Sequence, residues 1–182
     1  MLEEYIRRHE IDIIFLQEIT RTNIVNIGGY ETFDNIGTQM RGTSIVARKE
    51  FHLTNITTLP TGRAIAAEYK GIQLINIYAP SGTERRAERE HFYNTELPLL
   101  IRADYRKIIL GGDFNCIIDP VDTTGIFRNS RALANLIHGT HLRDTWTQNP
   151  INSTYTHHSP SGAKRIDRIY VSRELLQKKP GI

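Results

Sequence analysis

The sequence predicts an α+β fold in which two packed mixed β-sheets are flanked by helices, as in a four-layer αββα sandwich. Three observations favour it. Predicted strands outnumber helices, several neighbouring strands are joined by tight turns rather than by crossover helices, and 39% of the residues are apolar, enough for a real core. Because 182 residues suit one domain and are few for two, we expect a single domain over residues 1–182.

Four helices are expected from apolar residues recurring at spacings of three and four. Pro98 predicts a kink or a boundary in the longest of them. Ser130 is suited to cap the start of another, because its hydroxyl can accept from a free backbone N–H. The predicted helices are residues 2–9, 85–102, 130–138 and 174–179.

Strands are predicted where short apolar or alternating runs are bounded by turn residues. Lys70-Gly71 separates two such runs and indicates a tight hairpin. The predicted strands are residues 11–16, 30–33, 43–48, 55–59, 64–69, 72–78, 108–110, 142–146, 154–157 and 165–171.

Composition excludes several classes of protein. No apolar run approaches the roughly 18 residues of a membrane span, and the first residues do not resemble a secretory signal. A single cysteine, Cys116, cannot form an internal disulfide or a cysteine zinc cluster. We therefore expect an intracellular protein without a membrane partner. The net charge of +3 permits contact with a polyanion without requiring it.

Polar side chains stand at the ends of several predicted strands. Glu18 follows one, Asn76 and Tyr78 share a face near the end of another, and Asp113 and Asn115 follow the Gly111-Gly112 pair. Asp167 lies inside a further apolar run. Carboxylate and amide oxygens are the ligands that Mg²⁺ prefers, whereas zinc spacings and phosphate-binding glycine loops are absent from the sequence.

Each of these residues also has a purely structural interpretation. Glu18 and the asparagines could cap turns, and Tyr78 could be an ordinary half-buried strand residue. Asp167 is harder to explain in this way, because a carboxylate between Ile166 and Ile169 is costly to bury without a partner.

Four ordered motifs resemble those of the endonuclease/exonuclease/phosphatase superfamily, which includes DNase I and the abasic-site endonucleases. Within it, the chain is most similar to the endonuclease domain of LINE-type (non-LTR) retrotransposons, through the phrases at residues 41–46, 77–80 and 154–167. The four motifs are Leu16-Gln17-Glu18, Asn76-Ile77-Tyr78-Ala79-Pro80, Gly111-Gly112-Asp113-Phe114-Asn115 and residues 165–172.

The resemblance implies metal-assisted hydrolysis of a phosphodiester, with Mg²⁺ or Mn²⁺ as cofactor and DNA as partner. Glu18 would bind the metal, and Asp113 would orient or deprotonate the attacking water. Asn115 would hold the phosphate and its metal, and Tyr78 and Asn76 would line the phosphate site and stabilise charge developing there. Asp167 would orient a catalytic histidine. The residues expected to contact DNA are Thr156, Lys164 and Arg165.

The sequence departs from the family pattern at both ends. It begins at the helix that normally follows a first strand carrying an Asn, and it contains no Ser-Asp-His motif. We therefore expect a domain incomplete at both termini, and a chain that is unstable or much less active than a complete relative. Missing strands would lower its stability, because each buried apolar side chain contributes roughly 1.5–3 kcal/mol. A missing histidine would lower its activity, because general acid–base help is worth about 10²–10⁴ in rate.

Three hypotheses stay open at this point. The first is a retrotransposon-type DNA-nicking endonuclease, acting as a monomer in the nucleus, with a reverse transcriptase encoded downstream. The second is an inactive retroelement remnant or a nucleic-acid-binding module without turnover. The third is a phosphoester phosphatase of the same fold, although no dense basic cluster suits a multiply phosphorylated substrate.

Overall fold

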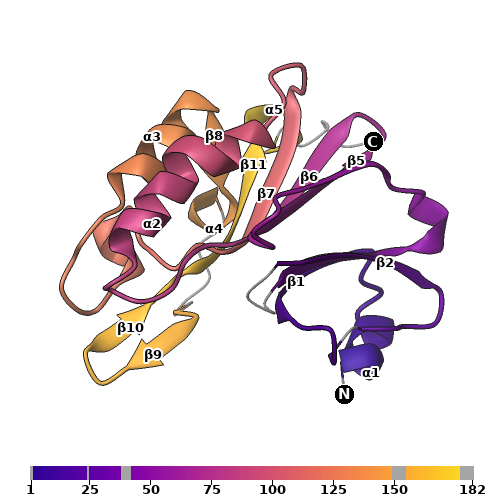
Figure 1. Cartoon of the computed structure of the whole chain (residues 1–182), viewed down its shortest axis with the longest axis horizontal. Coiled ribbons are helices and arrows are strands. Elements are labelled where there is room, and N and C mark those ends of the chain that lie inside the picture. The colour runs from indigo at the N-terminus through magenta and orange to yellow at the C-terminus, as the bar shows by residue number, and fades with distance from the viewer. Residues whose placement is uncertain (1, 24, 38–41, 149–154, 177–182) are drawn as a thin grey trace.

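The computed structural model describes residues 2–23, 25–37, 42–148 and 155–176 (Figure 1). Its helices are α1 (Leu2–Arg8), α2 (Arg86–His91), α3 (Arg131–Gly139), α4 (Thr145–Gln148) and α5 (Arg173–Leu176). Its strands are β1 (Ile13–Ile19), β2 (Tyr30–Ile36), β3 (Gly42–Arg48), β4 (Thr54–Thr58), β5 (Ala64–Tyr69), β6 (Ile72–Tyr78), β7 (Lys107–Asp113), β8 (Leu142–Asp144), β9 (His157–Ser159), β10 (Gly162–Lys164) and β11 (Asp167–Ser172).

The described strands form two main sheets and one separate hairpin. The larger sheet has the order β4-β5-β6-β7-β11-β8 and is mixed, because β6 and β7 run parallel while its other pairs are antiparallel. The smaller sheet has the order β1-β3-β2, and both of its pairings are antiparallel. Strands β9 and β10 pair with each other and project from the end of the larger sheet (Figure 1).

Three apolar clusters separate the layers. The first packs α2, α3 and the turns after α2 against the outer face of the larger sheet, with Phe92, Leu97 and Leu133 on the helical side. The second lies between the two sheets, and the third joins Ile6 of α1 to Val46 on the far face of the smaller sheet. The order helix, sheet, sheet, helix results from these contacts, as Figure 1 shows.

Strand β3 illustrates why two sheets stack here. Ile45 and Ala47 point into the cluster between the sheets, while Val46 between them points towards α1. All three side chains are buried, as expected for a strand covered on both faces. The continuous apolar run at residues 45–47 is therefore explained by the burial of both faces of β3.

Most predicted elements are present with shifted ends. Ser130 does cap α3, where its hydroxyl accepts from the N–H of Leu133 at 3.2 Å. The hairpin at Lys70-Gly71 is confirmed by the pairing of β5 with β6. The helix predicted over residues 85–102 is shorter and irregular: α2 passes into a π-helical turn at Phe92–Glu96 and a 3-10 turn at Leu97–Leu99, which contains Pro98.

The strand predicted over residues 142–146 is wrong in its second half. Strand β8 ends at Asp144, whose carboxylate accepts from the N–H of Trp146 at 3.0 Å. An aspartate that accepts from the residue two positions ahead satisfies a free N–H at a helix start, so the chain turns into α4 at Thr145. Part of the predicted strand 154–157 lies outside the described residues, and β9 begins at His157.

An open groove of about 750 Å³ lies between β1 and β11, and apolar side chains from both strands line it. Ile169 of β11 is 49% exposed there, although its neighbours Arg168 and Tyr170 are buried. No helix in the described part of the chain is both long and apolar enough to cross a membrane.

Gly112 provides a test of the close approach between β6 and β7, and Gly71, in the turn between β5 and β6, is its control. Gly112 has φ +130°, and a Cβ there would lie 2.1 Å from the carbonyl oxygen of Ile77, whereas Gly71 has φ +75° and open space around it. We predict that Gly112→Ala lowers the free energy of unfolding by more than about 3 kcal/mol, because backbone must move. Gly71→Ala should lower it by about 1 kcal/mol, the cost of backbone strain alone. Urea unfolding measures both, and equal losses would contradict the assigned packing.

Candidate active site

Glu18 reaches the candidate site because β1 contains a bulge. Gln17 pairs with Thr43 and Ile19 with Gly42, so Glu18 is the extra residue, and its φ of 58° is left-handed. A left-handed glutamate is uncommon and strained, which is a feature of functional positions. The bulge leaves its carboxylate exposed, with Oε1 accepting from the hydroxyl of Tyr78 at 2.8 Å.

Tyr78 is at the end of β6 in the other sheet and is 2% exposed. The guanidinium of Arg63 lies over its ring, 5.2 Å from the centroid, and donates to the backbone oxygen of Tyr78 at 3.4 Å. Arg63 therefore holds the ring in place, a role that no sequence motif indicated.

Asn76 is placed differently from its predicted role. Its side chain is fully buried, and its Nδ2 donates to the backbone oxygens of Leu16 and Ser44, each at 2.8 Å. Its Oδ1 accepts from Nε2 of Gln17 at 2.7 Å. The amide thus joins β6 to β1 and β3, so it positions the strand that carries Glu18 rather than facing a phosphate.

Asp113 and Asn115 lie beside Tyr78, because β6 and β7 are parallel and Tyr78 pairs with Asp113. The N–H of Asn115 donates to Oδ1 of Asp113 at 2.9 Å, and Nδ2 of Asn115 donates to the oxygen of Ala79 at 2.9 Å. Asn115 has a left-handed φ of 49°. Both predicted residues therefore lie at one strand end in a tightly bonded turn.

The surroundings of Asp113 disfavour its ionised form. Burial raises the pKa of its carboxyl to about 6, helped by the negative charges of Asp167 and Glu18 and opposed by the hydrogen bonds from Asn115. Asp167 is its direct cross-strand partner on β11. Three carboxylates thus converge on one region.

Asp167 is exposed rather than buried between Ile166 and Ile169. Strand β11 begins at Asp167, and the side chain of this residue faces solvent. No histidine in the described ranges hydrogen-bonds to it, so the predicted Asp-His pair stays a prediction. Thr156 supports the backbone here: its hydroxyl accepts from the N–H groups of Ile166 and Asp167, both at 3.1 Å.

Arg165 does not reach the surface as its predicted DNA contact requires. Its side chain is 6% exposed, and it donates to Asp122 at 2.7 Å and to Asp144 at 2.6 Å. Arg168 adds a third ion pair, with Asp122 at 3.0 Å. Sequence reasoning missed Asp122 and Arg168, because Asp122 lies 43 positions from Arg165 and 46 positions from Arg168 along the chain. Lys164 is half-buried at the end of β10.

The residues present fit a hard divalent cation of the Mg²⁺ type. No group of three or more His, Cys, Asp or Glu within the described ranges forms a ready-made metal cage. Mg²⁺ does not need one, because it commonly binds one or two carboxylates and takes its other ligands from water and substrate phosphate. Glu18 offers an exposed carboxylate. A cation there would relieve the repulsion from Asp167 and Glu18 that adds to the effect of burial on the pKa of Asp113.

The family model described as the endonuclease/exonuclease/phosphatase family matches residues 1–182. The chain belongs to this family. A curated relative, the DNA-(apurinic or apyrimidinic site) endonuclease 2 of Schizosaccharomyces pombe, is 39% identical over 67 residues, which are 34% of this chain and 13% of that protein. The match thus covers only a small part of that relative.

Solved structures of other proteins share the fold of this chain. An AP endonuclease from Archaeoglobus fulgidus superposes with a TM-score of 0.76 at 17% identity, covering 96% of this chain and 81% of that one. The 3′ phosphatase NExo from Neisseria, bound to a product DNA hairpin, gives a TM-score of 0.71 at 20% identity, covering 95% and 80%. The family model confirms the predicted superfamily, and the structural likenesses confirm the α+β fold, while the LINE-type assignment stays a prediction.

The raised pKa of Asp113 predicts a pH-dependent stability difference. Between pH 4 and 6 the folded state holds this proton more tightly than the unfolded chain, so stability falls as pH rises through that window. Asp113→Asn removes the penalty and should raise stability by about 1–3 kcal/mol above pH 7, and by little at pH 4. Thermal melts in EDTA measure the difference between variant and wild type, and the same difference at both pH values would contradict the assignment.

The buried ion-pair network predicts a large loss when its centre is removed. Asp122→Ala leaves Arg165 and Arg168 without their shared carboxylate and should lower the free energy of unfolding by about 3–5 kcal/mol. Asp104→Ala, which breaks an exposed pair with Arg102, is the matched control and should leave the urea midpoint unchanged. Similar midpoints for the two variants would show that the network contributes little.

Proposed function

We propose that this chain hydrolyses phosphodiester bonds in DNA with Mg²⁺ or Mn²⁺ as cofactor. The observation that carries the proposal is the meeting of two sheets at one point, where Glu18 bonds to Tyr78 and lies near Asp113 and Asn115. Membership of the family supports the reaction class.

Each residue has a specific task in this proposal. A metal held by Glu18 would polarise a phosphoryl oxygen when bound. Asp113 accepts a proton from the attacking water, and a pKa of about 6 suits a base that works near neutral pH. Asn115 and Tyr78 provide an amide and a hydroxyl that can donate to phosphate oxygens as negative charge develops on them.

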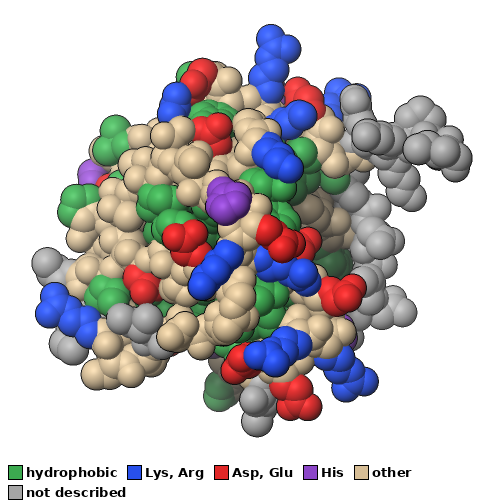
Figure 2. All heavy atoms as spheres, turned by 90° about the vertical axis from the view of Figure 1, so that its right-hand side faces the viewer, with side chains coloured by type: hydrophobic (Ala, Val, Ile, Leu, Met, Phe, Trp, Pro, Cys, Tyr) green, Lys and Arg blue, Asp and Glu red, His purple; other side chains and the backbone are tan. Residues whose placement is uncertain are grey.

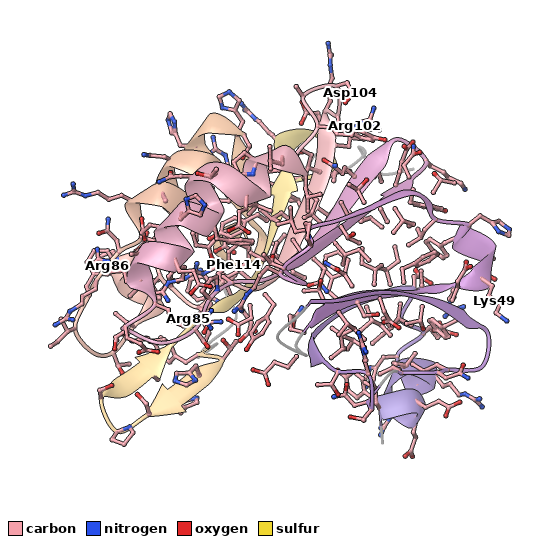
Figure 3. All side chains as sticks on the ribbon, viewed as in Figure 1. Lys49, Arg85, Arg86, Arg102, Asp104 and Phe114 are labelled. Carbon is pink, nitrogen blue, oxygen red and sulfur yellow. The ribbon has the colours of Figure 1, made fainter. Side chains whose placement is uncertain are left out.

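DNA is the proposed partner because basic side chains gather around this strand end. Lys164 of β10 and Arg86 of α2 line one cavity together with Asn115. Arg85, which pairs with Glu88 at 2.6 Å, lies at the start of α2 on the side nearer the strand ends in Figure 3. On the face turned away from the β9–β10 hairpin, by contrast, acidic and basic side chains are interspersed (Figure 2). Thr156 and Lys164 remain proposed DNA contacts, whereas the ion pairs of Arg165 give its side chain a structural role.

The names of the relatives make abasic-site DNA the first substrate to test. An S. pombe relative is named for apurinic or apyrimidinic sites, and the Neisseria structure is a 3′ phosphatase bound to a DNA product. The retrotransposon-type endonuclease, with nuclear location, a monomeric state and a downstream reverse transcriptase, is the finer proposal, and it rests on the sequence phrases alone.

The proposal predicts metal-dependent cleavage that requires Asp113. An oligonucleotide duplex with one abasic site, an intact duplex and supercoiled plasmid are each incubated with Mg²⁺, Mn²⁺ or EDTA. Asp113→Asn should lower the cleavage rate about 10²–10⁴-fold and leave DNA affinity nearly unchanged, because it removes a proton acceptor and keeps the shape. Asp104→Asn should cleave like wild type.

Other outcomes separate the alternatives. DNA binding without cleavage by folded protein would support a nucleic-acid-binding module and contradict the enzyme proposal. Release of phosphate from a 3′-phosphorylated end, without internal cleavage, would favour the phosphatase of the same fold.

A further inference from the structure

A second cavity adjoins the candidate site. It measures about 320 Å³ and lies between the start of α2, the turn after β7, the loop before α3 and the β9–β10 hairpin. Asn115 lines it, so it shares a wall with the catalytic region. Its size is at the lower end of ligand pockets, which span about 300–1,000 Å³, and suits a single nucleotide unit.

The charges that line this cavity favour an anion. Four cationic side chains and one carboxylate surround it: Arg86, Arg89, Arg128, Lys164 and Glu90. Glu90 already accepts from the N–H of Ala132 at 2.9 Å. Within the described ranges, no carboxylate forms an ion pair with Arg86, Arg128 or Lys164, in contrast to the fully paired Arg165.

Arg89 is the most deeply placed of these cations. It is 8% exposed, and its Nη1 donates to the oxygens of Pro80 and Gly82 at 2.8 and 3.0 Å. Its Nε is buried and has no hydrogen-bond partner among the described residues. A buried N–H of a charged group without an acceptor is costly, so a ligand oxygen at this position would be well stabilised.

Part of the cavity lining is apolar. Ile117 is buried, while Ile126 is 75% exposed although it lines the cavity. An exposed isoleucine beside these arginines is the combination that suits a sugar or base next to a phosphate. A free phosphate ion would make no use of this apolar side.

We infer that this cavity binds one nucleotide of the DNA strand beside the cleaved bond, with Arg86 and Arg128 on its phosphate and Ile126 against its sugar or base. The inference rests on the proposed function and adds a subsite that holds a phosphate which is not cut. Figure 3 shows Arg86 on the outer side of the start of α2, away from Arg85 and the strand ends.

The test measures binding of a fluorescein-labelled abasic duplex by anisotropy, in EDTA so that it stays intact, between about 50 and 200 mM salt. Arg86→Gln and Arg128→Gln should each weaken binding about 3–10-fold, and together lower the slope of log affinity against log salt by roughly one. Ile126→Ser should weaken binding without changing that slope, because it removes no charge.

Matched controls are Arg106→Gln and Arg143→Gln. Both arginines are exposed and border a different cavity, and Arg106 directly precedes β7, whose far end carries Asp113. Each control changes the net charge equally and should leave affinity and slope unchanged. If the cavity variants bind no more weakly than these controls, the inference is overturned.

A scan with single neutral methylphosphonate linkages locates the contact. One linkage other than the cleaved one should weaken wild-type binding, and this loss should vanish in the Arg86→Gln/Arg128→Gln variant. The same loss in both proteins would overturn the inference. Cleavage by Asp113→Asn in Mg²⁺ is scored separately: persistence of cleavage there would contradict the proposed function, whatever the binding results.

Discussion

The side-chain amide of Asn76 is the interaction on which the candidate site depends. It is fully buried, donates to two strands of the smaller sheet and accepts from Gln17, so it fastens β6 to β1 and β3 at the place where the sheets meet. A buried amide with three partners is well satisfied, whereas an apolar residue here would lose all three hydrogen bonds. This junction brings the β1 bulge, and with it Glu18, over the hydroxyl of Tyr78.

Strain and charge are concentrated around that junction. Glu18 and Asn115 both have left-handed backbones, and the pKa of Asp113 is raised by burial and by neighbouring carboxylates. Such features lower stability locally and persist only where the surrounding structure holds them. The apolar clusters on both faces of the larger sheet and the Arg165–Asp122–Arg168 network provide that support. A cation bound at Glu18 would offset part of the repulsion, which links metal binding to stability.

Local pattern and strand ends were enough to predict much of the fold and part of the site. Apolar runs located β3, β6 and β7, and the parallel pairing of Tyr78 with Asp113 brings together residues that are 35 positions apart. The features that the sequence could not predict depend on long-range pairing. Nothing near Arg165 in the chain indicates Asp122 as its partner, and nothing near Asn76 indicates that its amide is already used by β1 and β3. The β8–α4 turn was missed because the carboxylate of Asp144 overrides the strand tendency of its neighbours.

The position of a bound metal is the most direct test of the proposed site. Crystals grown with Mn²⁺ would show the ion by its anomalous scattering, independently of any activity. We expect one strong peak in contact with the carboxylate of Glu18, on the side facing Asp113, and its loss in a Glu18→Gln variant with the same fold. A peak elsewhere, or no peak at saturating Mn²⁺, would contradict the claim that the junction of the two sheets assembles a metal-dependent site.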